Sequence, residues 1–180
     1  LFSTGSVTKQ FTAAAIIYLE SSGKLSTDDS IDRYFMNVPS DKSGITIHHL
    51  LTHTSGLAHD YGSDEDSIGR DLFIANVLAQ PLEFEPGEQY SYSNAGYSLL
   101  AAIIEMVSDE NYEAFLQENL FKPLGMNHTG LHRLQVDDTL IAHSHNKELG
   151  YPSPANRPEN AWNLIGNGGI LSTTGDMYRW

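Results

Sequence analysis

The segment from Ser6 to about Ser22 constrains the fold most, because it is apolar on every face of a helix. Apolar residues recur at helical spacing and also fill the remaining faces: Val7, Phe11, Ala14, Ala15, Ile16, Ile17, Tyr18 and Leu19. A helix that is hydrophobic all round is buried, and Gly23 suits its C-terminal end. The sequence therefore predicts that this helix lies inside a single hydrophobic core.

Length, charge and composition limit the class of protein to which this chain can belong. The chain has 180 residues, of which 40% are hydrophobic, enough for one sizeable core. Its net charge is −13, with no basic cluster that could follow a phosphate backbone, which argues against a nucleic-acid partner. No stretch approaches 18 uninterrupted apolar residues, so no membrane span is predicted. The absence of cysteine excludes disulfides and thiolate metal ligands.

The remaining elements are predicted to be mostly helical with a few short strands. A proline-containing segment, 81–94, cannot be helical and must be extended, and 130–162 is polar and loop-like. Asn94 is expected to cap the helix that follows the extended segment. Helices, some of them short, are predicted within 26–35, 44–57, 67–80, 94–108 and 111–121, and a short extended piece leads into a helix capped at Thr173 or Thr174 near the end of 167–180.

A serine and a lysine three residues apart, Ser6 and Lys9, stand at the start of the buried helix. The spacing itself is weak evidence, because it arises by chance about once in a few hundred positions. At a helix N-terminus, however, the positive end of the dipole favours a developing alkoxide, and Lys9 lies one turn further on nearly the same face. The other such pairs lie at a helix C-terminus and in a polar stretch: Ser21 with Lys24, and Ser144 with Lys147.

This arrangement suits a serine nucleophile with its base. A hydroxyl attacks an acyl carbon only when a base takes its proton, and lysine can do so once burial lowers its pKa from about 10.4. The structural alternative is that Ser6 caps the helix and Lys9 extends to water. From this stretch alone both interpretations stay open.

A second polar corner, Tyr92-Ser93-Asn94, marks the junction of the extended segment and an apolar helix. A phenol near a lysine can carry a proton between nucleophile and leaving group, and an amide can hold a substrate carbonyl or the lysine. The structural alternative makes Tyr92 a core aromatic and Asn94 an ordinary helix cap.

Other candidate sites carry weaker signals. His49 and His53 have helical metal-ligand spacing and His143 and His145 lie two apart, but no third ligand is evident, so neither a metal nor another cofactor is predicted. Ser55, in the stretch HTSGL, lacks the Gly-x-Ser-x-Gly pattern of a nucleophile elbow and is interpreted as a turn residue.

Five segments in order resemble the serine β-lactamase and penicillin-binding-protein superfamily, over essentially all 180 residues: GSVTKQFTAAAI, ITIHHLLTHTSGL, FEPGEQYSYSNAGYSLLAAIIE, LFKPLGMNHTG and NGGILSTTGDM. The resemblance is closer to the class C β-lactamase, D-Ala-D-Ala carboxypeptidase and serine esterase branch. It implies Ser6 as acylated nucleophile, Lys9 as base or proton relay, Tyr92 as partner acid/base and Asn94 as substrate-orienting amide.

The resemblance also sets expectations for the rest of the protein. Family members are longer, with flanking sheet strands and a late Lys/His-x-Gly motif that this sequence lacks, so 1–180 is expected to be a serine hydrolase domain incomplete at both ends and weak or inactive alone. The expected substrate is a β-lactam, a D-alanyl peptide or a small ester. The alternative is a catalytically silent penicillin-recognising or peptide-binding relative. A periplasmic or secreted location is favoured by the resemblance, and a cytoplasmic one stays open.

Overall fold

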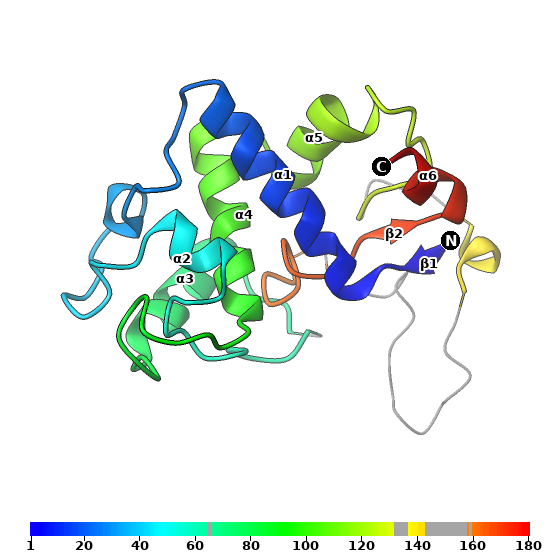
Figure 1. Ribbon diagram of the computed structural model, residues 1–180. Coiled ribbons are helices and arrows are strands. Elements are labelled where there is room, and N and C mark those ends of the chain that lie inside the picture. The colour runs from blue at the N-terminus through cyan, green and yellow to red at the C-terminus, as the bar shows by residue number, and fades with distance from the viewer. Residues whose placement is uncertain (65, 132–136, 143–157, 159) are drawn as a thin grey trace.

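The protein is described by a computed structural model that covers residues 1–64, 66–131, 137–142, 158 and 160–180. It is mostly helical, with strand pairing between two short segments near the ends of the chain (Figure 1). The fold class predicted from the sequence is therefore confirmed. Within the described residues, no helix is both long and apolar enough to cross a membrane.

The element bounds show how short most of the pieces are. The α-helices are α1 Thr8–Ser21, α2 Ile47–Leu51, α3 Arg70–Ala79, α4 Asn94–Ser108, α5 Tyr112–Leu116 and α6 Thr174–Arg179. Single turns of other helix types are η1 Gly5–Val7, η2 Ile31–Arg33, η3 Gln117–Phe121 and η4 Asp138–Leu140. The strands β1 Phe2–Ser3 and β2 Leu171–Ser172 pair antiparallel, with Phe2 opposite Ser172.

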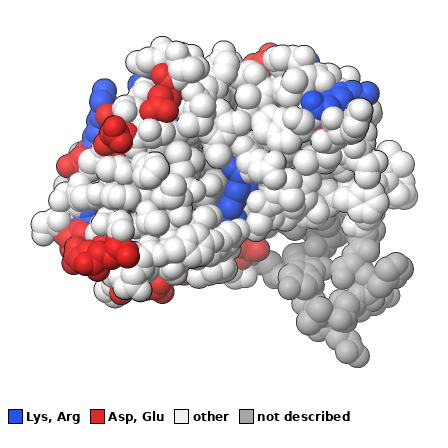
Figure 2. All heavy atoms as spheres, viewed as in Figure 1, with Lys and Arg blue, Asp and Glu red and all other residues white. Residues whose placement is uncertain are grey.

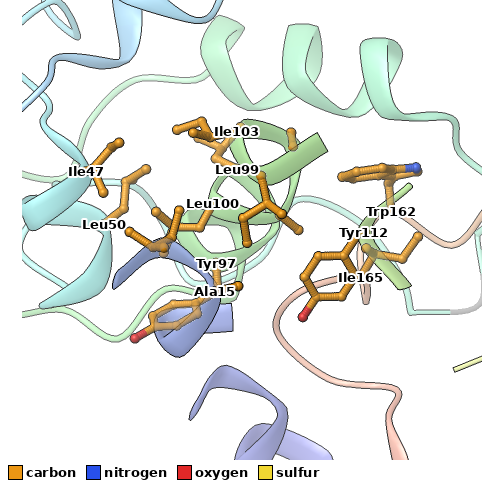
Figure 3. Packing of buried hydrophobic residues seen from close by; sticks show 14 of the residues in the cluster. Ala15, Ile47, Leu50, Tyr97, Leu99, Leu100, Ile103, Tyr112, Trp162 and Ile165 are labelled. Carbon is orange, nitrogen blue, oxygen red and sulfur yellow. The ribbon is translucent and has the colours of Figure 1, made fainter. Parts of the chain in front are cut away.

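Two long helices form the centre of the core. Helix α4 is buried at every position from Ala95 to Ile104, and it contacts α1, α2 and α5. Figure 3 shows side chains of α4, including Leu99, Leu100 and Ile103, among side chains of the neighbouring elements. Burial of this much apolar area, at about 25 cal/mol per Å², supplies the main stabilisation of the fold.

Helix α1 is buried on one side only, although its sequence is apolar on all. Phe11, Ile16 and Leu19 are fully buried, whereas Ile17 is 50% exposed and Tyr18 43% exposed. The prediction of a buried helix therefore holds for one side of α1, the side that α4 and its neighbours cover (Figure 1). Gly23 ends the helix with a φ of 68°, as predicted.

The predicted helix within 26–35 reduces to the single turn η2. Both the amide N–H and the hydroxyl of Thr27 donate to the Glu20 carboxylate, so this residue braces the end of α1 instead of starting a helix. Ser30 takes over as cap, and its hydroxyl accepts from the N–H of Asp32.

The cap of α4 is Ser93, not Asn94 as expected. Ser93 has an extended backbone, and its hydroxyl accepts from the N–H of Gly96 at 3.1 Å while donating to the carbonyl of Ala58 at 2.8 Å. Asn94 is the first helical residue, so its side chain is free to bond elsewhere. This difference of one residue determines the geometry of the candidate site.

The 163–170 loop, which leads into β2, is inserted between α1 and α4. Thr12 of α1 donates to the carbonyl of Gly166 at 2.6 Å, and Ser98 of α4 donates to the carbonyl of Ile165 at 2.7 Å. Gly166 has a φ of 86°, and a β-carbon there would lie 2.6 Å from both the Ala101 β-carbon and the Tyr97 carbonyl oxygen. Only glycine fits this position without a shift of the backbone.

We therefore expect Gly166→Ala to lower the free energy of unfolding by about 2–4 kcal/mol, through backbone strain and overpacking between α1 and α4. Gly44→Ala is the matched control, since Gly44 has an ordinary φ and open space around its α-carbon, and we expect a change within about 0.5 kcal/mol. Urea denaturation of both variants measures the difference. Equal unfolding free energies would contradict this role of the loop.

Candidate active site

Ser6 lies in the turn η1, immediately before the first residue of α1. Gly5 has a φ of 52°, and Thr4 anchors the turn by donating both its N–H and its hydroxyl to the carbonyl of Ile170 at 2.9 Å. The Ser6 side chain is exposed and caps neither η1 nor α1. Its hydroxyl is therefore presented to solvent at the positive end of the α1 dipole.

Lys9 is buried, with 6% of its surface exposed, and its ammonium group has three acceptors in the described residues. The Nζ atom lies 2.7 Å from Asn94 Oδ1, 2.9 Å from the carbonyl oxygen of Asn167 and 3.4 Å from Ser6 Oγ. The alternative in which Ser6 caps the helix and Lys9 extends to water is thereby excluded. The structure brings Ser6, Lys9 and Asn94 together.

The two shorter bonds fix the orientation of the amine. When Lys9 is neutral, it has two N–H bonds and one lone pair in a tetrahedral arrangement. Asn94 and the Asn167 carbonyl can each accept only from an N–H, so they occupy the two donors. The lone pair is then directed towards the hydroxyl of Ser6, which is the geometry that a proton acceptor requires.

Burial also favours the neutral amine. Loss of hydration lowers the pKa of Lys9 from its ordinary value of 10.5, because the desolvated ammonium is less stable than the amine. The phenol of Tyr92 and the carboxylates of Asp60 and Asp64 act in the opposite direction without cancelling the effect.

The Tyr92-Ser93-Asn94 corner lies beside this lysine. The Lys9 Nζ atom is 4.8 Å from the centre of the Tyr92 ring, within the range of a cation–π contact. Tyr92 is half-buried and stacks on His53 with ring centres 4.4 Å apart. All four residues singled out by the sequence, Ser6, Lys9, Tyr92 and Asn94, thus lie in one cluster.

Asn94 uses its side chain on the protein itself. Its oxygen accepts from Lys9, and its nitrogen donates to Asp60 Oδ1 at 2.9 Å. Of the two roles considered for this amide, holding the lysine is the one that these contacts support. Orientation of a substrate by Asn94 stays a prediction.

Three residues of the site were missed in the sequence. Asn167 is 3% exposed, accepts from Lys9 through its carbonyl, and donates its amide to Ser98 and to the carbonyl of Asn163. His53 contacts Tyr92, and Asp60 bonds Asn94. The only signal for Asn167 in the sequence is its place before two glycines, Gly168 and Gly169.

The other serine and histidine residues considered from the sequence make structural hydrogen bonds where the structure describes them. Ser55 is buried, and its hydroxyl accepts from the N–H of Leu57 at 3.3 Å, as expected of a turn residue. The Nδ1 atoms of His49 and His53 each accept from a backbone N–H. No group of three potential metal ligands lies together in the part of the chain that the structure describes. His143, His145, Ser144 and Lys147 lie outside the described residues.

Charges are unevenly distributed on the face drawn in Figure 2. Asp and Glu side chains gather at its lower left edge, over the segment that precedes α4, whereas Lys or Arg atoms appear near its middle. The acidic segment includes Glu83, Glu85 and Glu88.

Comparison with known proteins places this geometry in context. A family model described as Beta-lactamase matches residues 1–180. Penicillin-binding protein 4* of Bacillus subtilis (strain 168) is 34% identical over 200 residues, which cover 100% of this chain and 44% of that protein.

Two solved structures are similar over 99% of this chain. A beta-lactamase/D-alanine carboxypeptidase from Yersinia pestis, complexed with citrate, has a TM-score of 0.83 and 26% identity, and 52% of its chain is covered. The D-amino acid amidase from Ochrobactrum anthropi SV3, complexed with L-phenylalanine amide, has a TM-score of 0.82 and 25% identity, with 53% covered. This chain spans about half the length of the relatives it matches.

The electrostatics of the site can be tested without any assay of activity. We expect NMR of ¹³Cε-labelled lysine to show that Lys9 titrates below 10.5, because burial disfavours its charged form. Asp60→Asn should lower the midpoint further, since it removes a negative charge but keeps the oxygen that Asn94 requires. Asp71→Asn is the control, because Asp71 is exposed on α3 and pairs with Arg70. A midpoint at or above 10.5, or equal shifts in both variants, would refute this description.

Proposed function

Because this chain belongs to the beta-lactamase family, we propose that it contains the acylation site of a serine hydrolase, with Ser6 as the nucleophile. The observation that carries the proposal is the placement of buried Lys9, whose amine is held by Asn94 and Asn167 and faces the Ser6 hydroxyl.

The first step transfers a proton and forms one bond. Neutral Lys9 takes the proton of the Ser6 hydroxyl as Oγ attacks the acyl carbon, and the carbonyl electrons move onto oxygen. The α1 dipole favours the negative charge that develops near Ser6. Lys9 becomes an ammonium whose three N–H bonds match its three acceptors, Ser6, Asn94 and the Asn167 carbonyl.

The second step breaks the scissile bond. Tyr92 donates its phenolic proton to the leaving amine or alkoxide and recovers a proton from the Lys9 ammonium, which leaves Ser6 acylated and Lys9 neutral. The Lys9 Nζ atom lies over the Tyr92 ring, 4.8 Å from its centre, so the two groups that exchange the proton are neighbours. Water then attacks the acyl-enzyme, with Tyr92 and Lys9 carrying the proton in the reverse direction.

The proposed substrates are β-lactams, D-alanyl peptides, D-amino-acid amides and small esters, which share an acyl carbon next to a leaving group. The similar D-alanine carboxypeptidase and D-amino acid amidase support the peptide and amide members of this group. Because the chain spans about half the length of its relatives, these substrates are proposed for the whole gene product that carries this chain.

Covalent labelling tests the proposal directly. We expect a fluorophosphonate or a penicillin to form an adduct on Ser6, detected by peptide mass spectrometry of the gene product that carries this chain. Ser6→Ala should abolish the adduct and Ser55→Ala should not, since Ser55 is a buried turn residue. Absence of any adduct on Ser6 with both reagents would favour the second candidate, a binding relative that recognises its ligand without acylation.

The proton-transfer roles of Lys9 and Tyr92 predict a specific kinetic pattern. We expect Lys9→Ala and Tyr92→Phe each to slow acylation by about 10²-fold or more with little change in substrate binding, because general acid–base catalysis contributes factors of that size. Stopped-flow acylation at saturating reporter substrate separates the rate from the affinity. A variant that acylates at the unmodified rate from pH 6 to 9 would assign that residue a structural role instead.

A further inference from the structure

His53 adopts a left-handed backbone conformation, with a φ of 59°. Only a few per cent of residues other than glycine do so, and histidine, like asparagine and aspartate, is among those that adopt it most often. Such conformations cost about 1–3 kcal/mol and persist where the surrounding contacts fix them, often at functional sites. The N–H of His53 donates to the carbonyl of Leu50 at 3.4 Å, and its other hydrogen bonds and its closest ring contact lead to residues 91–93.

One histidine contacts three consecutive residues, Ser91, Tyr92 and Ser93. The carbonyl of His53 accepts from the N–H of Ser91 at 2.9 Å, and its Nδ1 accepts from the N–H of Ser93 at 3.1 Å. Between these two bonds its ring stacks on Tyr92, with centres 4.4 Å apart and an angle of 28° between the planes. The backbone on each side of Tyr92 and the face of its ring are thus fixed by a single residue.

The bond to Ser93 sets the protonation state of the imidazole. Because Nδ1 accepts a hydrogen bond, it carries no proton, so the ring is neutral with its proton on Nε2. An imidazolium has two N–H donors and no acceptor. Protonation of His53 at Nδ1 therefore breaks the bond to Ser93 and places a second cation beside Lys9.

The groups that face His53 favour the neutral ring. Burial, the positive charge of Lys9 on α1 and the neighbouring His59 all lower the pKa of His53 from 6.5. The phenol rings of Tyr90, Tyr92 and Tyr97 lie around it, with centres 4.4–5.9 Å away.

We propose that His53 is a positioning residue, whose neutral imidazole holds the Tyr92 phenol beside Lys9 and whose protonation releases it. The inference rests on the proposed function, because it assigns Tyr92 a role in proton transfer. His59 also contacts the Tyr92 ring, at 5.5 Å, but its ring is exposed and bonds Asp60 rather than the backbone of the corner.

Two variants separate the functions of the ring. His53→Asn keeps an acceptor at the position of Nδ1 and tolerates the left-handed backbone, but cannot titrate. His53→Phe keeps a ring to stack on Tyr92 and loses the acceptor. We expect acylation of Ser6 in His53→Asn to stay within about threefold of the unmodified rate at pH 8, and in His53→Phe to fall about tenfold or more with little change in KM.

A second readout does not require activity. With ¹³Cζ-labelled tyrosine, the Tyr92 resonance of the unmodified protein should move as pH falls through the midpoint of His53, which is below 6.5. This pH-dependent change of the Tyr92 resonance should vanish in His53→Asn. It should persist in His48→Gln, the control, because His48 is an exposed histidine of α2.

The outcomes distinguish this inference from the proposed function. If Ser6 is never acylated in the unmodified protein, the proposed function fails, and the NMR titration, which needs no substitution, still decides whether His53 holds Tyr92. A Tyr92 resonance that ignores the titration of His53 overturns the inference. So does a folded His53→Phe protein that acylates Ser6 at the unmodified rate.

Discussion

The burial of one amino group, that of Lys9, is the constraint on which the rest of the site depends. Taking an ammonium group out of water is costly unless acceptors replace its hydration. Lys9 makes its two shorter hydrogen bonds to acceptors from different parts of the fold. One acceptor is the Asn94 side chain on α4, and the other is the Asn167 carbonyl in the 163–170 loop. The third, Ser6, is the group on which chemistry is proposed. Stability and reactivity therefore depend on the same three contacts.

The core explains why those acceptors are where they are. Ser93 caps α4, which leaves Asn94 free to bond Lys9. The 163–170 loop reaches the lysine because Gly166, which lacks a side chain, lets the loop fit between α1 and α4. Thr12 and Ser98 then hold the loop by donating hydrogen bonds to its carbonyls. A polar network buried in this way is stable only when every member is satisfied, which fixes the position of the amine more tightly than apolar packing does.

The sequence was sufficient to predict most of the helices and the four residues of the cluster, because apolar periodicity and the resemblance of ordered motifs are local signals. The helix predicted within 26–35 is the exception, since only the turn η2 forms there. It predicted the cap of α4 one residue too late, since Ser93 and Asn94 are both good caps and only the contact with Ala58 decides between them. Asn167 and His53 were missed for a related reason. Asn167 acts through its backbone carbonyl and His53 through contacts across the fold, and neither leaves a pattern in its own segment.

The most direct test of the central claim compares two pH values measured independently. One is the titration midpoint of Lys9 from lysine NMR, and the other is the midpoint of the rising limb of Ser6 acylation by a fluorophosphonate, whose own reactivity is known across the range. If neutral Lys9 takes the proton of Ser6, we expect the two midpoints to coincide below 10.5 and to move together in Asp60→Asn. An acylation limb that stays in place when the Lys9 midpoint moves would contradict the role of Lys9 as the base.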